Sequence, residues 1–220
     1  MATFLTRNLK SKMTAGERRF YDLLAQHLND DYLIWYNLPL QGNYRRYPDY
    51  LIFHPKYGLL SIEIKDWAMK ALKKLKGHHQ LTLDFGQGES TYDSPLEQAR
   101  SSLFPLINKL KEDPLLLQTE GVYKGKLIIP WGYGAVMTNW EYQKITDVAR
   151  GAIETLFPRK TTFYKEDILE GNLSQTEFIE KLHGLFPYQF NYPITFEQAT
   201  RIRARIFPEF IVNADQQVFF

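Results

Sequence analysis

The first periodic segment of the chain reads as an amphipathic helix. Residues 14–17 have the Thr-x-x-Glu form of a capping box, and apolar residues from Phe20 to Leu28 follow at helical spacing. The pattern therefore predicts a helix over residues 15–27, with its apolar side facing the rest of the protein.

Three strand-like segments follow this helix. Residues 32–40 and 47–53 are aromatic and aliphatic, and residues 59–64 alternate between apolar and polar side chains. Because successive side chains of a strand point to opposite faces, the alternation puts Glu63 and Lys65 on one face and the apolar residues on the other.

The rest of the chain alternates between helical and strand patterns. Residues 70–77 are rich in Lys and read as a basic loop or a short helix, before a short strand and a polar turn over 86–90. Ser94 to Glu97 combine an N-cap, a Pro suited to the first helical position and a capping-box Glu, which predicts a long helix. Later patterns predict strands over 126–131 and 134–138, and helices over 145–156, over 174–185 and from 195.

Strands interleaved with helices predict an α/β fold, a mixed sheet with helices on its faces. The stretch rich in Pro and Tyr before residue 194 favours a boundary, so we expect one domain over residues 1–190 and a C-terminal helix and connector over 191–220. In this tail we expect Ile202 and Ile206 to form an apolar stripe and the three arginines to stay mostly solvated. We expect the tail to contribute little to the core of the domain.

Composition narrows the class of protein. The 220 residues are 44% hydrophobic, which is enough for a packed core, and the lack of Cys excludes disulfides and thiolate zinc sites. No apolar run approaches the ~20 residues of a membrane span, and the N-terminus lacks the apolar core of a signal peptide. We therefore expect a cytoplasmic protein with no membrane partner. The net charge of +2 does not by itself indicate nucleic-acid binding, so that inference depends on local clusters.

Asp49, Glu63 and Lys65 are charged residues inside the most apolar, strand-prone stretch. Buried charges are costly unless they are paired or bind a metal. Glu63 and Lys65 share one strand face, about 6–7 Å apart, and Asp49 on the neighbouring strand can reach the same point. Two carboxylates and the carbonyl of Ile64 make a partial oxygen cage that suits Mg²⁺ or Mn²⁺. Lys65 can then position or deprotonate an attacking water, so the pattern predicts phosphodiester hydrolysis.

Simpler interpretations of these residues stay open. Glu63 and Lys65 could be a solvated pair on an edge hairpin, although the preceding Asp49 and the apolar opposite face make this alternative the weaker one. Glu17 could only close the capping box, or it could turn toward the strands and join the acidic cluster. Gln98 could be exposed, or it could reach the substrate phosphate.

Four motifs carry a resemblance to a known family. Gly16-Glu17 opens the first helix, Pro48-Asp49 begins a strand, and the sequences IEIKDW from Ile62 and SPLEQ from Ser94 follow in that order. In this order they resemble the nuclease-related domain, NERD, a branch of the PD-(D/E)XK phosphodiesterase superfamily. The resemblance covers about residues 13–138, and it departs after Trp67, where a Lys-rich insertion replaces a short Gly-containing turn.

The resemblance implies a restriction-endonuclease-like core and Mg²⁺-dependent cleavage of nucleic acid. It implies Asp49 and Glu63 as metal ligands, Lys65 as the catalytic base or stabiliser, and Glu17 and Gln98 as accessory site residues. The expected substrate is nucleic acid, DNA in preference to RNA, within DNA processing or repair. We expect the lysines of the insertion to bind it, namely Lys70, Lys73, Lys74 and Lys76.

Domains of this family often precede helicases, and residues 195–209 are similar to the lead-in to a superfamily 1 helicase. The chain has no Gly-Lys-Ser/Thr phosphate loop of its own. We therefore expect either a standalone nuclease or, preferably, the N-terminal part of a protein with a helicase domain in the same chain or in a partner.

Two rival functions belong to other classes. One is a nucleic-acid-binding module with a vestigial site, in which the lysines and aromatic residues such as Tyr44, Tyr47 and Trp67 hold the substrate without cutting it. The other is a domain that only docks a helicase. The intact set of Asp49, Glu63 and Lys65 argues against both, because neither role needs carboxylates that repel phosphate.

Overall fold

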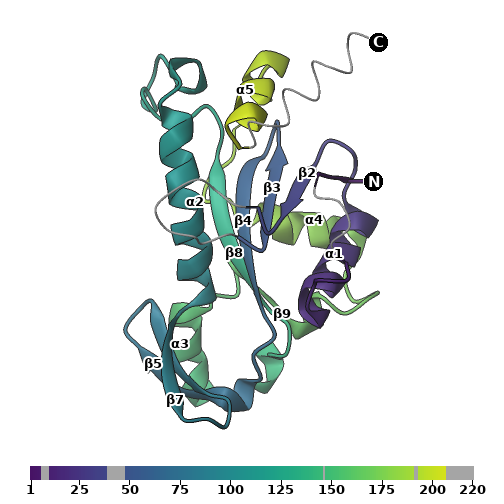
Figure 1. Ribbon diagram of the computed structural model, residues 1–220, viewed down its shortest axis with the longest axis vertical. Coiled ribbons are helices and arrows are strands. Elements are labelled where there is room, and N and C mark those ends of the chain that lie inside the picture. The colour runs from purple at the N-terminus through teal and green to yellow at the C-terminus, as the bar shows by residue number, and fades with distance from the viewer. Residues whose placement is uncertain (6–9, 39–47, 146, 191–192, 207–220) are drawn as a thin grey trace.

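The structure is a computed structural model that describes residues 1–5, 10–38, 48–145, 147–190 and 193–206. It confirms the expected α/β class, because helices and strands alternate along the chain (Figure 1). The strands are β1 (Thr3–Phe4), β2 (Leu33–Tyr36), β3 (Tyr50–His54), β4 (Gly58–Lys65), β5 (Leu72–Lys76), β6 (Gln80–Asp84), β7 (Glu89–Asp93), β8 (Trp131–Met137) and β9 (Thr162–Tyr164). The helices are α1 (Ala15–His27), α2 (Pro95–Lys111), α3 (Asp147–Leu156), α4 (Gln175–His183) and α5 (Phe196–Ile206), with short 3-10 turns at η1 (Met69–Ala71), η2 (Pro114–Leu116), η3 (Tyr142–Lys144) and η4 (Lys165–Asp167).

A six-stranded mixed sheet forms the centre of the molecule, in the order β1-β2-β3-β4-β8-β9. The strands β2, β3 and β4 are antiparallel neighbours, whereas β4, β8 and β9 run parallel. The parallel connections are long enough to carry helices across the faces of the sheet. This sheet, flanked by helices, is the restriction-endonuclease-like arrangement that the motifs imply.

Each face of the central sheet is covered by a separate apolar cluster. On one face, Phe20 of α1 and Phe178 of α4 pack against the even-numbered residues of β4. On the other face, Leu106 of α2 and Ile202 of α5 pack against Leu59 and the odd-numbered residues of β3. Figure 1 shows α2 on one side of the sheet and α1 and α4 on the other. Among the described residues, no helix is long and apolar enough to cross a membrane.

The region after β4 differs from its sequence-based prediction. The Lys-rich stretch is neither a loop nor a helix beyond the short turn η1, because β5, β6 and β7 form a second, antiparallel sheet. Leu81 and Leu83 of β6 are fully buried in a third apolar cluster with Trp140 and residues of α3. This burial stabilises the strand conformation. The exposed lysines make the strand pattern hard to recognise in the sequence.

Two other element predictions need correction. The two strands expected over 126–131 and 134–138 are one strand, β8, preceded by irregular chain. The short edge strands β1 and β9 were not predicted, because two or three residues are too few to show a period. Parts of the predicted strands, residues 39–40 and 47, lie outside the described residues.

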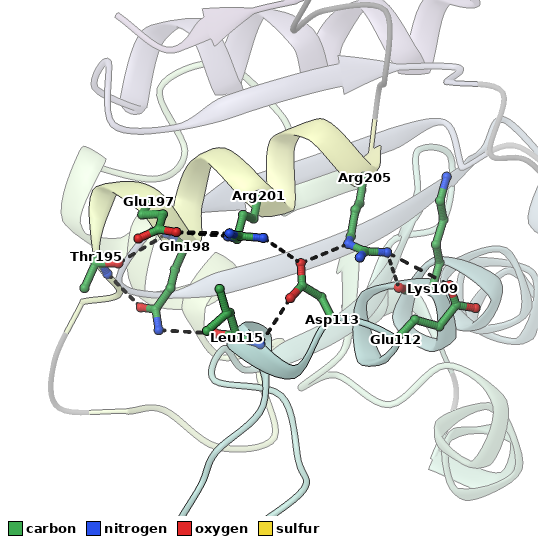
Figure 2. A network of polar contacts seen from close by, with 9 residues as sticks. All are labelled: Lys109, Glu112, Asp113, Leu115, Thr195, Glu197, Gln198, Arg201 and Arg205. Carbon is green, nitrogen blue, oxygen red and sulfur yellow. Dashed lines mark hydrogen bonds and ion pairs between the residues drawn. The ribbon is translucent and has the colours of Figure 1, made fainter.

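Helix α5 packs on the nuclease-like body more closely than expected. Ile202 and Ile206 form the predicted apolar stripe and are buried on the same cluster as α2. The three arginines were expected to stay mostly solvated, but all of them are half-buried, and Arg201 and Arg205 both pair with Asp113 (Figure 2). The tail residues after Ile206 lie outside the described part of the chain, and the division of the chain at residue 190 stays a prediction.

Candidate active site

The site lies where β3 begins and β4 ends. The last pair of the β3–β4 ladder joins Tyr50 to Ile62, so one further step of this antiparallel register places Asp49 opposite Glu63. Because side chains alternate along a strand, Glu63 lies on the same sheet face as Ser61, whose hydroxyl is 3.2 Å from that of Ser102 on α2. Two carboxylates therefore share the face that α2 covers.

Short contacts join these residues. The amide N–H of Ile64 donates a hydrogen bond of 2.6 Å to Oδ2 of Asp49, and the Nζ atom of Lys65 lies 2.5 Å from Oε1 of Glu63. Glu63 is only 7% exposed, because β4 lies between β3 and β8 in the centre of the sheet. The alternative of a solvated pair on an edge hairpin is therefore wrong.

The charge balance of this cluster is unusual. Burial raises the pKa of the Asp49 carboxyl above its ordinary value, and the neighbouring charge of Glu63 raises it further. The Ile64 amide and the Lys65 ammonium act in the opposite direction and do not compensate, while Glu17 adds a smaller like-charge effect. Counted over the described residues, the site thus holds more negative charge than Lys65 neutralises, and a bound metal ion would relieve this excess.

Glu17 closes the capping box and also turns toward the strands, while its role as an accessory site residue stays a prediction. Its carboxylate accepts a hydrogen bond of 2.7 Å from the Thr14 amide, which completes the capping box of α1. The same Oε2 atom also accepts a bond of 2.8 Å from the hydroxyl of Tyr36, and the Tyr50 hydroxyl donates to the Glu17 carbonyl at 2.7 Å. These tyrosines of β2 and β3 hold the start of α1 at the same end of the sheet as Asp49.

Asp66 is a positioning residue that the sequence reasoning missed. Its carboxylate accepts a bond of 3.2 Å from the Gly16 amide at the start of α1 and another from the hydroxyl of Thr138, which follows β8. A Cβ atom on Gly16 would lie 2.1 Å from Asp66 Oδ1, so only Gly allows the helix to approach this closely. Two features of the sequence could have indicated this role. Asp66 directly follows the Glu63-x-Lys65 motif, and a helix elsewhere in the chain begins with Gly16-Glu17.

Gln98 belongs to the same end of the sheet, on α2. Ser61 of β4 and Ser102 of α2 are in contact. Gln98 lies one helical turn before Ser102, and Glu63 lies two residues after Ser61, so each is about 5–7 Å from the contact along its own element. The Nε2 atom of Gln98 donates a bond of 2.7 Å to the carbonyl of Asp93, which ties the start of α2 to the end of β7. This placement leaves the predicted contact with substrate phosphate as a prediction.

The lysines of the insertion are spread over η1 and β5, all of them exposed. Lys73 lies 3.8 Å from Asp84, and Lys76 donates a bond of 2.8 Å to the Thr91 hydroxyl. Trp67 lies closer to the site, with its ring centre 5.6 Å from the Lys65 ammonium. Two other aromatic residues considered at the outset, Tyr44 and Tyr47, lie outside the described residues.

The residues present fit a hard divalent cation only in part. Among the described residues, no group of three or more His, Asp or Glu side chains could hold a metal ion by itself. Asp49 and Glu63 supply carboxylate oxygens. In a strand the N–H and C=O groups of one residue point to the same side, so the Ile64 carbonyl points toward β3, as does the Ile64 amide that binds Asp49. Water and substrate oxygens would have to complete a coordination sphere for Mg²⁺ or Mn²⁺.

Comparison with known proteins bears on this site. The family model of the nuclease-related domain matches residues 12–126, which is just over half of the chain and includes both strands of the site and all of α2, β5, β6 and β7. No curated protein and no solved structure gave a match. With its motifs, its sheet and this match in agreement, the chain belongs to the nuclease-related domain family, NERD.

Proposed function

We propose that this protein is a metal-dependent nuclease that hydrolyses phosphodiester bonds of nucleic acid, DNA in preference to RNA. Asp49, Glu63 and the Ile64 carbonyl would hold Mg²⁺ or Mn²⁺. When bound, the ion would lower the pKa of a coordinated water and neutralise charge on the scissile phosphate. Membership of a nuclease-related family supports the reaction class, and the residues of the chain supply its remaining steps.

Lys65 is the group proposed to act on the reacting atoms. Its ammonium is held 2.5 Å from Glu63, so a phosphate that reaches the carboxylates comes within range of the same cation. There it can orient the attacking water and stabilise the negative charge that develops on the pentavalent transition state. The Trp67 ring centre lies 5.6 Å from this ammonium, within the range of a cation–π interaction.

One observation carries the proposal: the carboxylates of Asp49 and Glu63 lie on paired strands in a largely buried position, and within the described part of the chain the cation beside them is the Lys65 ammonium. A structural role would not require this arrangement, because like charges placed directly opposite each other destabilise a sheet. A site for a divalent cation does require it. For the same reason the site argues against a vestigial, non-catalytic module.

The test combines metal binding with cleavage. We expect weak Mg²⁺ or Mn²⁺ binding without substrate, because two carboxylates fill only part of the coordination sphere, and tighter binding with a substrate oligonucleotide. Calorimetry of the wild type, Asp49→Ala and Glu63→Ala measures this independently of activity. Equal metal binding by all three proteins would refute the site, and metal binding without cleavage of any DNA or RNA substrate would favour the binding-module alternative.

We also propose the cellular setting: a cytoplasmic enzyme of DNA processing or repair, connected through residues 191–220 to a helicase domain in the same chain or in a partner. The resemblance of residues 195–209 to a helicase lead-in supports this connection. Co-purification of the protein with a helicase, and stimulation of cleavage by unwinding with ATP, would test it. A nuclease whose cleavage is unaffected by any helicase would argue against it.

A further inference from the structure

Three aromatic side chains form a row that begins at the candidate active site. The Trp67 ring lies beside Lys65, the Tyr92 ring centre is 5.8 Å from that of Trp67, and the Phe85 ring centre is 6.2 Å from that of Tyr92. Phe85 is 53% exposed and Tyr92 is 36% exposed, although large aromatic side chains are normally buried. We call Trp67, Tyr92 and Phe85 the aromatic row.

The aromatic row lies on one face of the small β5–β7 sheet. Tyr92 is the cross-strand partner of Leu81, and Phe85 follows Leu83 by two residues, so all of them point to the face that also contacts the third apolar cluster. Beyond the buried leucines this face continues as Tyr92 and Phe85, which no described element covers fully. The row therefore runs from Trp67, beside Lys65, to Tyr92 on β7 and Phe85 after β6.

The opposite face of this sheet has a different character. Lys74 and Lys76 lie there, but the cross-strand pairs place Asp84, Glu89 and Asp93 on the same face. The mixture of signs neutralises much of the field that these lysines would otherwise produce. This face is therefore a poor surface for a duplex, whose exterior is a continuous array of phosphates.

We propose that the aromatic row binds single-stranded nucleic acid by base stacking and leads the strand to Lys65. This inference deepens the proposed nuclease function and rests on it. Stacking requires unpaired bases whose faces are accessible, and every base offers such a face, so the recognition is independent of sequence. Neighbouring rings meet at angles of 51° and 70°, so they are not stacked face to face on one another, and the exposed parts of Tyr92 and Phe85 can stack with bases of an extended strand.

The experiment measures binding without chemistry. In EDTA, where no metal-dependent cleavage occurs, fluorescence anisotropy compares a labelled single strand with a duplex of the same sequence, for the wild type, Tyr92→Ala and Phe85→Ala. We expect the single strand to bind more tightly than the duplex, and each Ala variant to weaken its binding about 5- to 150-fold. Tyr92→Phe keeps the ring, and we expect it to bind as the wild type does.

A second exposed aromatic group provides a matched control. Tyr123 is 50% exposed and lies 6.4 Å from Tyr188 and 6.2 Å from Phe190, in the loop after η2, at the far end of α2 from the site. Tyr123→Ala removes a ring of the same size from a similar cluster. We expect it to leave single-strand binding unchanged.

The outcomes separate this inference from the proposed function. Single-strand binding that is lost in Tyr92→Ala and Phe85→Ala but kept in Tyr123→Ala supports the aromatic row, even if the protein cleaves nothing. Wild-type binding by both Ala variants, equal loss in Tyr123→Ala, or no single-strand binding at all overturns it, even if metal-dependent cleavage of duplex DNA is observed.

Discussion

Two buried carboxylates of this protein, Asp49 in the candidate site and Asp167 beside β9, have opposite electrostatic surroundings. Asp167 is 4% exposed, receives both guanidinium nitrogens of Arg159 and lies 3.3 Å from the Lys181 ammonium. Burial alone would raise the pKa of Asp167, but the Arg159 hydrogen bonds, the Tyr164 amide and Lys181 lower it below its ordinary value. The negative charge of Asp167 is therefore balanced by the cations Arg159 and Lys181, and we call it the matched carboxylate.

Asp49 has the reverse balance. Burial and Glu63 raise its pKa, and the Lys65 ammonium that could offset them is already shared with Glu63. The partners of Asp167 stabilise the fold, whereas the cation that the described residues place beside Asp49 is Lys65, which Glu63 also uses. The contrast supports the proposal that the cluster around Asp49 binds an added cation, at a cost in the stability of the protein alone.

The largest expected effect is on cleavage. Asp49→Asn keeps an acceptor for the Ile64 amide but removes the charge, so cleavage should fall at least about 10³-fold, as when a group that stabilises transition-state charge is removed. In EDTA the same variant should be as stable as the wild type or more stable, by up to about 1 kcal/mol, because the like-charge contact with Glu63 is gone. Urea unfolding measures this, and a large loss of stability would contradict the comparison.

Lys65→Ala should reduce cleavage about 10²-fold or more while the fold and metal binding persist, because the ammonium acts on water and the transition state and is not a ligand. Lys65→Arg should also fail, since a guanidinium has a different shape and cannot act as a base. Single-turnover kinetics and calorimetry on the same samples separate the two properties. Wild-type cleavage by either variant would exclude a catalytic Lys65.

For Asp167 we expect the opposite of Asp49: its replacement should reduce stability and leave metal binding unchanged. Asp167→Asn leaves Arg159 and Lys181 without their shared anion, so the free energy of unfolding should fall by about 2–3 kcal/mol, allowing for the partial exposure of Arg159. Metal binding at the Asp49 site should be unchanged. A change in metal affinity without a loss of stability would reverse the assignment of the two carboxylates.

A third carboxylate, Asp113, tests how the exposure of its cationic partners reduces the contribution of an ion pair to stability. Asp113 accepts a bond of 3.1 Å from the Leu115 amide and joins α5 to the end of α2 through Arg201 and Arg205 (Figure 2). Both arginines are partly exposed, so Asp113→Asn should lower the melting temperature less than Asp167→Asn does. Differential scanning calorimetry of the two variants side by side gives the ranking, and a larger effect at Asp113 would make the docking of α5 central to the fold.

The smallest effect concerns a histidine pair at the opposite end of the sheet. The pKa values of His54 and His183 are lowered to about 4, mainly by burial. The charge of His54 also lowers the pKa of His183, Lys56 lowers both values, and Asp31 raises that of His54. Between about pH 6.5 and 4 the unfolded chain therefore binds protons that the folded chain does not, so this pair costs stability as the pH falls.

His183→Gln tests this pH dependence. The variant lacks one of the two groups, so from about pH 7.5 to 5 its melting temperature should fall less than that of the wild type, by on the order of 2–4 °C. The raised pKa of Asp49 acts in the opposite direction and is common to both proteins, which makes the difference between them informative. An equal fall in both proteins would exclude a contribution from His183.

Short-range patterns in the sequence predicted much of the site. Capping boxes and helical spacing located α1 and α2, and strand alternation put Glu63 and Lys65 on one face of β4. These features depend on hydrogen bonds and side-chain directions within a few residues, so the local sequence is sufficient to specify them. The same reasoning applied to residues 70–77 failed, because exposed lysines dominate the pattern there and the burial of Leu81 and Leu83 is supplied from elsewhere.

The sequence by itself determined which residues could carry the chemistry, and the tertiary structure decided their environment. That Asp49 stands opposite Glu63, and that β4 lies in the centre of the sheet, depends on strand pairings between distant segments. Such pairings also place Asp66 against Gly16 and Tyr92 beside Trp67. Charge burial, and with it the raised pKa of Asp49, exists only after these segments have packed, because desolvation is a property of all the surrounding atoms and not of neighbours in the chain.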